Sequence, residues 1–167
     1  MKIEVKKIKL SKSLSEETPA YTASVFINDK HFADVSNHGT GGCDNVYPPK
    51  GTPMNDPAWN ARLASVEQYI KDQFPKHSYV ADGETHTYDE SLEGVCQAAA
   101  WADDLMKSIK RDLASKVMFT KADGKVYQVK SKGAEQVRMI AVVKAMPTTV
   151  KILNELPIEE AAKLLGA

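Results

Sequence analysis

The sequence predicts an α+β domain in which a mainly antiparallel sheet, built from two hairpins, packs against two main helices and is followed by a C-terminal strand and a short helix. Segments with strand-like alternation come first, two segments with helical periodicity fill the middle, and β-rich and helical segments return at the end. Because 167 residues suffice for one core and are few for two, we expect a single domain over residues 1–167.

The first strand is expected in the lysine-rich N-terminal segment. Its apolar residues are Ile3, Val5, Ile8 and Leu10, and the alternation slips between Val5 and Ile8, which indicates a β-bulge. Lysines on the polar side are typical of an edge strand. A polar stretch that ends at Pro19 connects it to the next strand.

A β-hairpin is predicted over residues 21–35. Alternate positions of its first strand are apolar, and the pair Asn28-Asp29 favours a tight turn. Its second strand leads directly into a long Gly/Pro-rich loop, residues 37–57. Loops of that length in a compact domain are usually functional or disordered, so this loop is where we expect a site.

Two helices are expected in the middle of the chain. Asp56 suits the N-cap and Pro57 the first helical position, so the first helix begins there and ends near Pro75. Its apolar face is formed by Trp59, Leu63, Val66, Ile70 and Phe74. The second helix runs from Asp89 to Leu113, with acidic residues before basic ones, as the helix dipole favours.

The segment between the two helices is predicted to be a solvated, flexible connector. It carries a cluster of side chains that could in principle bind a cation, namely His77, Asp82, Glu84 and His86. Their order matches neither an EF-hand nor a pair of histidines at helical spacing. We therefore predict no metal site here or elsewhere.

The last part of the chain should contain a second hairpin over residues 117–130, turning at Asp123-Gly124. Residues 133–146 are interpreted as a helix, although their β-branched run leaves a strand open. Residues 148–153 are β-rich, and residues 158–165 form a short helix. Asn154 or Glu155 is expected near the cap of that helix.

Charge and cysteine content limit the class of partner. The 22 basic and 22 acidic side chains cancel, so no global field favours nucleic acid or an anionic membrane, and neither is expected as a partner. Cys43 and Cys96 should remain thiols, because no signal peptide precedes them and the expected location is the cytoplasm. No apolar run approaches the roughly 20 residues that span a bilayer.

Charge is nonetheless uneven along the chain. Lysines gather at the N-terminus and acidic residues in the segment from Asp82 to Glu93. Solvated faces explain both clusters, and the alternative is a nucleic-acid mimic or binder that uses one of them. A homo-oligomer is left open.

The glycines of the long loop indicate either an anion-binding site or a structural turn. Small residues directly after a strand can turn successive backbone amides toward an anion, and the alternative is a structural turn in which glycine supplies positive φ. The segment has neither the P-loop ending nor the dinucleotide-binding spacing. Trp101 is added because tryptophan is frequent at interface hot spots. The candidate ligand- or partner-binding residues are Asn37, His38, Gly39, Thr40, Gly41, Gly42, Asp44, Tyr47 and Trp101.

An enzyme is the alternative from another functional class. His38, Cys43 and Asp44 in the loop have the side-chain types of a metal site or of a thiol nucleophile, although their spacing is not a zinc signature. No general base is evident from the sequence for Cys43. We predict no catalytic residue and no cofactor.

Two segments carry a resemblance to known proteins. These are Phe32-Ala33-Asp34-Val35-Ser36-Asn37-His38-Gly39-Thr40-Gly41-Gly42 and Ile152-Leu153-Asn154-Glu155-Leu156-Pro157-Ile158-Glu159-Glu160-Ala161. Together they resemble small accessory proteins of uncharacterised activity encoded by bacteriophages and prophages. The resemblance implies a protein that acts in the cytoplasm of a bacterial host, where it binds a host protein or counters a defence system. We therefore expect a phage-type accessory protein that engages a host protein or a small ligand through residues 37–57.

Overall fold

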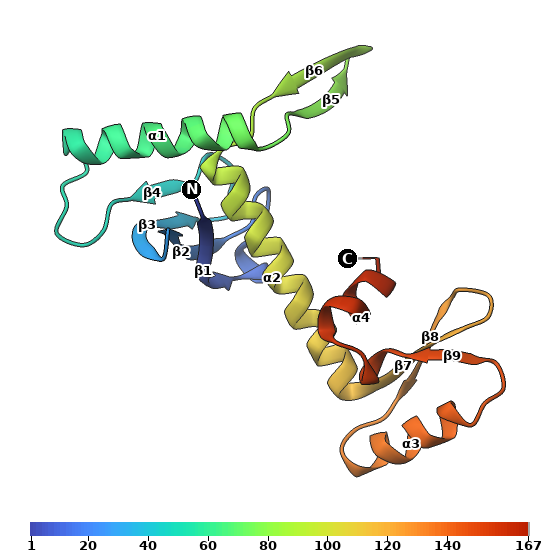
Figure 1. Ribbon diagram of the computed structural model, residues 1–167. Coiled ribbons are helices and arrows are strands. Elements are labelled where there is room, and N and C mark those ends of the chain that lie inside the picture. Colours follow the sequence, from blue (N-terminus) through green and yellow to red (C-terminus); the bar gives the residue numbers. More distant parts are fainter. Residues whose placement is uncertain (167) are drawn as a thin grey trace. The chain divides into compact units, whose positions relative to one another are not determined.

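Antiparallel strands and α-helices build the computed structural model, which confirms the predicted α+β class (Figure 1). The structure describes residues 1–166. Two compact units divide the chain: an N-terminal unit, Met1–Ala102, and a C-terminal unit, Asp103–Ala167. That residues 1–167 form one domain stays a prediction. No helix within the described residues is long and apolar enough to cross a membrane.

A four-stranded antiparallel sheet forms the centre of the N-terminal unit. Its strands lie in chain order: β1 (Ile3–Leu10), β2 (Tyr21–Ile27), β3 (Lys30–Asn37) and β4 (Asn45–Tyr47). A short 3-10 helix, η1 (Lys12–Leu14), follows β1. The predicted β2–β3 hairpin is confirmed, and Asn28 and Asp29 in its turn have φ of 48° and 64°. Two successive residues with positive φ match the twist of the flanking strands.

The predicted bulge in β1 is also confirmed. Lys6 lies opposite Ser24 and Lys9 opposite Thr22, so two residues, Lys7 and Ile8, face a single residue of β2. Lys7 takes a φ of 55°, which is uncommon outside glycine. The bulge keeps Ile8 packed against the core although the alternation has slipped.

Two helices cover one face of this sheet. α1 (Pro57–Gln73) begins as predicted, with Asp56 Oδ1 accepting from the backbone amides of Ala58 (2.7 Å) and Trp59 (3.1 Å). Phe74, predicted on its apolar face, instead lies just past its end and is exposed, because the helix stops before Pro75. α2 (Leu92–Ser115) contributes its first half to this unit. The buried core comprises Tyr21, Ala23, Val25, Phe32, Ala33, Val35, Trp59, Val66, Ile70, Leu92, Cys96 and Ala100.

The connector between α1 and α2 is solvated, as predicted, but it has regular structure. β5 (His77–Ala81) and β6 (Glu84–Tyr88) pair as an antiparallel hairpin. Asp82 and Gly83 form its turn with φ of 53° and 82°. An Asp-Gly pair is itself a hairpin signal, but no strands were expected in this segment, and its flexibility stays a prediction.

A three-stranded sheet with helices on both faces forms the C-terminal unit. The strand order is β8 (Val126–Lys130), β7 (Lys116–Lys121) and β9 (Thr149–Ile152), all antiparallel. The predicted hairpin is β7–β8. Residues 133–146 contain a helix, α3 (Ala134–Lys144), and not a strand. A 3-10 helix, η2 (Leu153–Glu155), precedes α4 (Ile158–Leu164).

Successive residues of β7 point to opposite faces of this sheet. Val117 and Phe119 pack with Val143 of α3, whereas Met118 packs with Ala161 of α4. Both faces of the central strand are therefore buried, which explains its apolar run.

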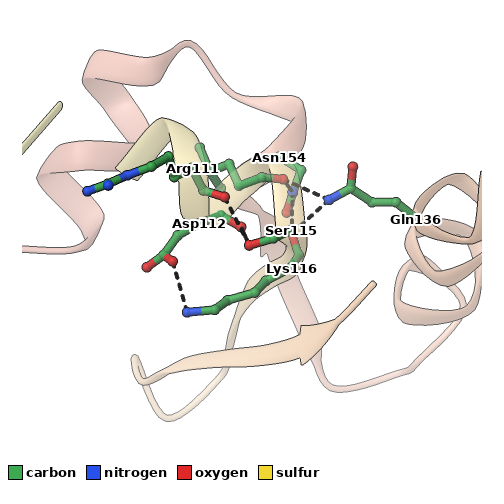
Figure 2. Close-up of polar contacts among 7 residues, drawn as sticks. Arg111, Asp112, Ser115, Lys116, Gln136 and Asn154 are labelled. Carbon is green, nitrogen blue, oxygen red and sulfur yellow. Dashed lines mark hydrogen bonds and ion pairs between the residues drawn. The ribbon is translucent and has the colours of Figure 1, made fainter. Parts of the chain in front are cut away.

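Two amides hold the turn where α2 ends, as Figure 2 shows. Gln136 Nε2 and Asn154 Nδ2 both donate to the carbonyls of Leu113 and Lys116, at distances of 2.7–3.0 Å. Asn154 Oδ1 accepts from the amide of Met118 at 2.8 Å. Asn154 therefore satisfies carbonyls at the end of α2. It does not cap α4, because the N-cap of that helix is Pro157 and no side chain hydrogen-bonds there.

Candidate functional site

Buried polar side chains hold the first part of the long loop. Asn37 Nδ2 donates to Asp44 Oδ1 at 2.8 Å and to the Gly42 carbonyl at 3.3 Å. Its Oδ1 accepts from the Gly39 amide and from the Thr18 hydroxyl, each at 2.8 Å. Asn37 is only 5% exposed, and the polar atoms of its amide have partners inside the protein. These bonds give Asn37 a structural role, and its part in ligand binding stays a prediction.

Asp44 is the centre of the same network. Its carboxylate accepts from the Tyr21 hydroxyl, from Asn37 and from Gln97 Nε2 at 3.2 Å, and the residue is 8% exposed. Burial, and then the hydrogen bond to Asp44, raise the pKa of Tyr21 well above its ordinary value. The phenol thus stays protonated and keeps donating. Asp44 has its acceptor oxygens turned into the protein and away from solvent.

The loop glycines shape the backbone. Gly39, Gly41 and Gly42 have φ of 89°, 86° and 91°. The carbonyl of Gly39 accepts from the amide of Glu16, and a Cβ on Gly39 would lie 2.1 Å from the Leu14 carbonyl oxygen. The amides of Gly39 and Gly41 already donate to Asn37 and to the Thr18 hydroxyl. This geometry favours the structural turn over an anion-binding nest.

Four exposed residues of the loop bear on the predicted chemistry: His38, Thr40, Cys43 and Tyr47. No hydrogen bond within residues 1–166 joins Cys43 to His38 or to Asp44, so neither of these side chains is positioned as a base for the thiol. No group of three His, Cys, Asp or Glu side chains in the described part of the chain is placed to hold a metal ion.

The other two predicted features lie on α2. Trp101 is 49% exposed, in keeping with a surface role, and in the described structure no hydrogen bond or ring contact joins it to the loop. Cys96 is buried on the core face. Burial first, and the nearby charge of Asp44 second, raise the pKa of its thiol to about 12. A buried thiol with that pKa is unreactive.

A groove of about 610 Å³ lies on the face of the four-stranded sheet that α1 and α2 leave uncovered. We call this the open sheet face. The side chains that define it are Lys7, Lys9, Thr22, Ser24, Asp34, Ser36 and Tyr47. A second groove, of about 260 Å³, adjoins it through Lys9 and Thr22 and extends to His38. Three of the predicted site residues therefore line these adjoining grooves: Tyr47 lines the larger one, and Asn37 and His38 line the smaller one.

The bulge in β1 concentrates positive charge on this face. Lys6 lies opposite Ser24 and Lys9 opposite Thr22 on β2, and both Lys7, which has a positive φ, and Lys9 line the larger groove. Lys6 pairs with Glu4 at 3.1 Å. Within residues 1–166, Lys7 and Lys9 form no ion pair. Asp34, the one acidic side chain that lines the larger groove, is hydrogen-bonded by Ser24 at 2.8 Å and lies 3.1 Å from His31 Nε2.

Sequence reasoning identified the slip in β1 but not its consequence. The slip between Val5 and Ile8 was the signal from which a cluster of lysines on one face could have been inferred. Hydroxyl groups on β2 and β3 gave no comparable signal, because serine and threonine on an exposed strand face are ordinary.

Comparisons of the chain with models of protein families, with curated proteins and with solved structures found no match. The resemblance to phage-encoded accessory proteins stays a prediction.

Proposed function

We propose that this protein is a non-catalytic binding module whose open sheet face accepts an anionic ligand or an anionic segment of a partner protein. The observation that carries the proposal is the pair of connected grooves flanked by Lys7 and Lys9, two lysines without an ion pair in the described structure. Hydrogen bonds from charged donors are stronger than those between neutral groups. A carboxylate or phosphate in the groove would meet both lysines.

The groove also offers donors besides the lysines. The hydroxyls of Thr22 and Ser36 line it between β1 and β4. Ser24 already donates to Asp34 and is therefore less available. A ligand that carries several oxygen acceptors, such as an acidic peptide, matches this lining because it can pair with lysines and hydroxyls together.

The buried network of the loop supports this proposal by fixing one wall of the groove. Asp44, which three side chains hold in place, directly precedes β4. Tyr47 on β4 lies opposite Asp34 on β3. The aromatic wall is thus positioned before a ligand arrives, and preorganisation lowers the entropic cost of binding.

A phage-type role would give this module a biological partner. In that proposal the anionic segment belongs to a protein of the bacterial host, the complex forms in the host cytoplasm, and binding counters a defence system. The proposal rests on the resemblance of residues 32–42 and 152–161 alone.

Single-stranded nucleic acid is a second candidate, favoured by one observation. Lys6 Nζ and Lys7 Nζ lie 5.0 Å and 5.9 Å from the ring centroid of Phe26, so aromatic and cationic groups are adjacent. Lysines along an exposed surface with aromatic rings between them are the features on which unpaired bases and phosphates bind. The zero net charge weighs against it.

Calorimetric titration with three probes tests the proposal: hexaglutamate, inorganic phosphate and a ten-residue oligothymidylate. We expect hexaglutamate to bind. The double variant Lys7→Gln/Lys9→Gln should weaken the affinity for hexaglutamate at least tenfold, since each charged contact contributes about 1–1.5 kcal/mol. Lys30→Gln/Lys50→Gln is the matched control, because it removes the same charge from exposed residues that line neither groove.

The controls separate the outcomes. Equal loss of affinity in both double variants would show nonspecific charge attraction and contradict a groove site. Tight binding of oligothymidylate alone, with a steep salt dependence, would favour the second candidate. Absence of binding by all three probes would refute both.

A further inference from the structure

The hairpin β5–β6, which Figure 1 labels, carries a row of exposed aromatic rings. His77 stacks on Tyr88 with ring centroids 5.1 Å apart, and Tyr79 stacks on His86 at 5.2 Å. The ring centroids of Tyr79 and Tyr88 are 6.2 Å apart, so the two stacked pairs form one continuous row. Both tyrosines are 54% exposed. A contiguous exposed aromatic surface usually marks an interaction site.

Strand register places these rings on one side of the hairpin. His77 pairs with Tyr88, Tyr79 with His86 and Ala81 with Glu84, and residues at alternate positions share a face. Glu84 therefore belongs to the same face as the rings. We call this face, formed by His77, Tyr79, Ala81, Glu84, His86 and Tyr88, the aromatic face. The opposite face carries Ser78, Val80, Thr85 and Thr87.

Charge on the hairpin determines which occupant fits. Residues 77–88 contain no lysine or arginine but include Asp82 and Glu84. Neither forms an ion pair within residues 1–166, whereas at the base of the hairpin Lys76 pairs with Asp89 at 2.9 Å and His77 lies 2.8 Å from Glu90. The end that carries Glu84 is thus negative and uncompensated. The faces of aromatic rings also attract cations.

A second copy of this hairpin is a poor occupant. Residues 77–88 supply no lysine or arginine to pair with Glu84, and two hairpins with aligned turns would bring like charges together, which opposes association. A basic segment has the complementary charge, and its arginine side chains can stack on tyrosine while pairing with a carboxylate.

We propose that the aromatic face binds an arginine-bearing peptide segment of a partner protein, with guanidinium groups stacked on Tyr79 and Tyr88 and paired with Glu84. The proposal is independent of the anionic partner assigned to the open sheet face, since the two surfaces share no residue. The hairpin adds a second binding surface of opposite charge preference.

Titration of the protein with a Gly-Arg hexapeptide (GRGRGR), monitored through the tyrosine resonances in NMR spectra, tests the proposal. The matched ligand has citrulline in place of arginine, which keeps the shape and removes the charge. We expect the arginine peptide to bind at least fivefold more tightly and to shift the ring signals of Tyr79 and Tyr88. Tyr79→Leu should weaken binding at least threefold, because leucine keeps apolar area but removes the ring.

Glu84→Gln should also weaken the arginine peptide, and Thr87→Ala on the opposite face should leave it unchanged. Circular dichroism of each variant verifies that the core remains folded, which we expect since the hairpin residues lie outside the cores. Equal affinity for the citrulline peptide, or no effect of Tyr79→Leu, would overturn the proposal. Self-association in sedimentation experiments that Tyr79→Leu abolishes would also overturn it, in favour of a second copy.

Discussion

Replacing Gly39 by alanine should destabilise the N-terminal unit far more than the same change at Gly42. Both glycines have positive φ, 89° and 91°. A Cβ at Gly39 would lie 2.1 Å from the Leu14 carbonyl oxygen and 2.8 Å from the Ala20 Cβ, whereas a Cβ at Gly42 has no atom within 4 Å. Comparing the two variants therefore separates the cost of positive φ, which both share, from the cost of steric overlap, which only Gly39→Ala has.

The magnitudes follow from these two terms. Positive φ costs an alanine about 1–2 kcal/mol, which is the whole expected loss for Gly42→Ala. Overlap with a well-packed neighbour adds about 1–3 kcal/mol, so Gly39→Ala should lose roughly 2–5 kcal/mol in total. The Leu14 carbonyl has little room to retreat, because the Gly39 carbonyl holds the following residues through the amides of Glu16 and Glu17.

Urea unfolding followed by Trp59 fluorescence measures the difference. Trp59 is buried and its ring centroid lies 4.9 Å from that of Phe32, so its emission reports the core of this unit. A Trp101→Phe background removes the exposed second tryptophan. With a slope of about 2 kcal/mol/M, an extra 2 kcal/mol moves the midpoint by about 1 M between the two variants. Equal midpoints would refute the inferred contact between Gly39 and Leu14.

Three further predictions concern individual contacts. Asn154→Ala should destabilise the C-terminal unit by about 2–3 kcal/mol, since three hydrogen bonds are lost; hydrogen exchange at the Met118 amide should accelerate, and unchanged protection would contradict the role. The hydrogen bond from Tyr127 lowers the pKa of Asp123 below its ordinary value, so Tyr127→Phe should raise that pKa toward the ordinary value in an NMR titration. Because the pKa is lower in the folded state, ionised Asp123 stabilises the protein above pH about 4, and this contribution is lost as the pH falls below that value. An unshifted titration of Asp123 in the variant would argue against the bond. Thiol labelling of the native protein should modify Cys43 rapidly and Cys96 only on unfolding, since Cys96 is buried with a pKa of about 12; rapid labelling of both would contradict the packing.

Local signals in the sequence predicted most of the elements. Asp56-Pro57 located the start of α1, and turn pairs at Asn28-Asp29 and Asp123-Gly124 located two hairpins. Each signal acts through residues within a few positions, so propensity and spacing suffice. The β5–β6 hairpin was missed because its strands mix histidine, threonine and tyrosine instead of alternating apolar and polar residues.

Long-range contacts could not be inferred in the same way. Asn154 bonds to backbone groups 36 and 41 residues earlier, at Met118 and Leu113. Asp44 similarly accepts from Gln97, 53 residues away. Such pairs depend on the tertiary arrangement. For this reason the internal hydrogen bonds of Asn37 and Asp44 could not be foreseen from the sequence, and the role of these residues in binding stays a prediction.

Amide chemical-shift mapping with hexaglutamate tests whether the open sheet face is the anion-binding groove that we propose. We expect the largest shifts on Lys7, Lys9, Thr22, Ser36 and Tyr47, and we expect them to saturate with one affinity. Shifts that are absent, or spread over lysines outside the groove such as Lys30 and Lys50, would contradict it.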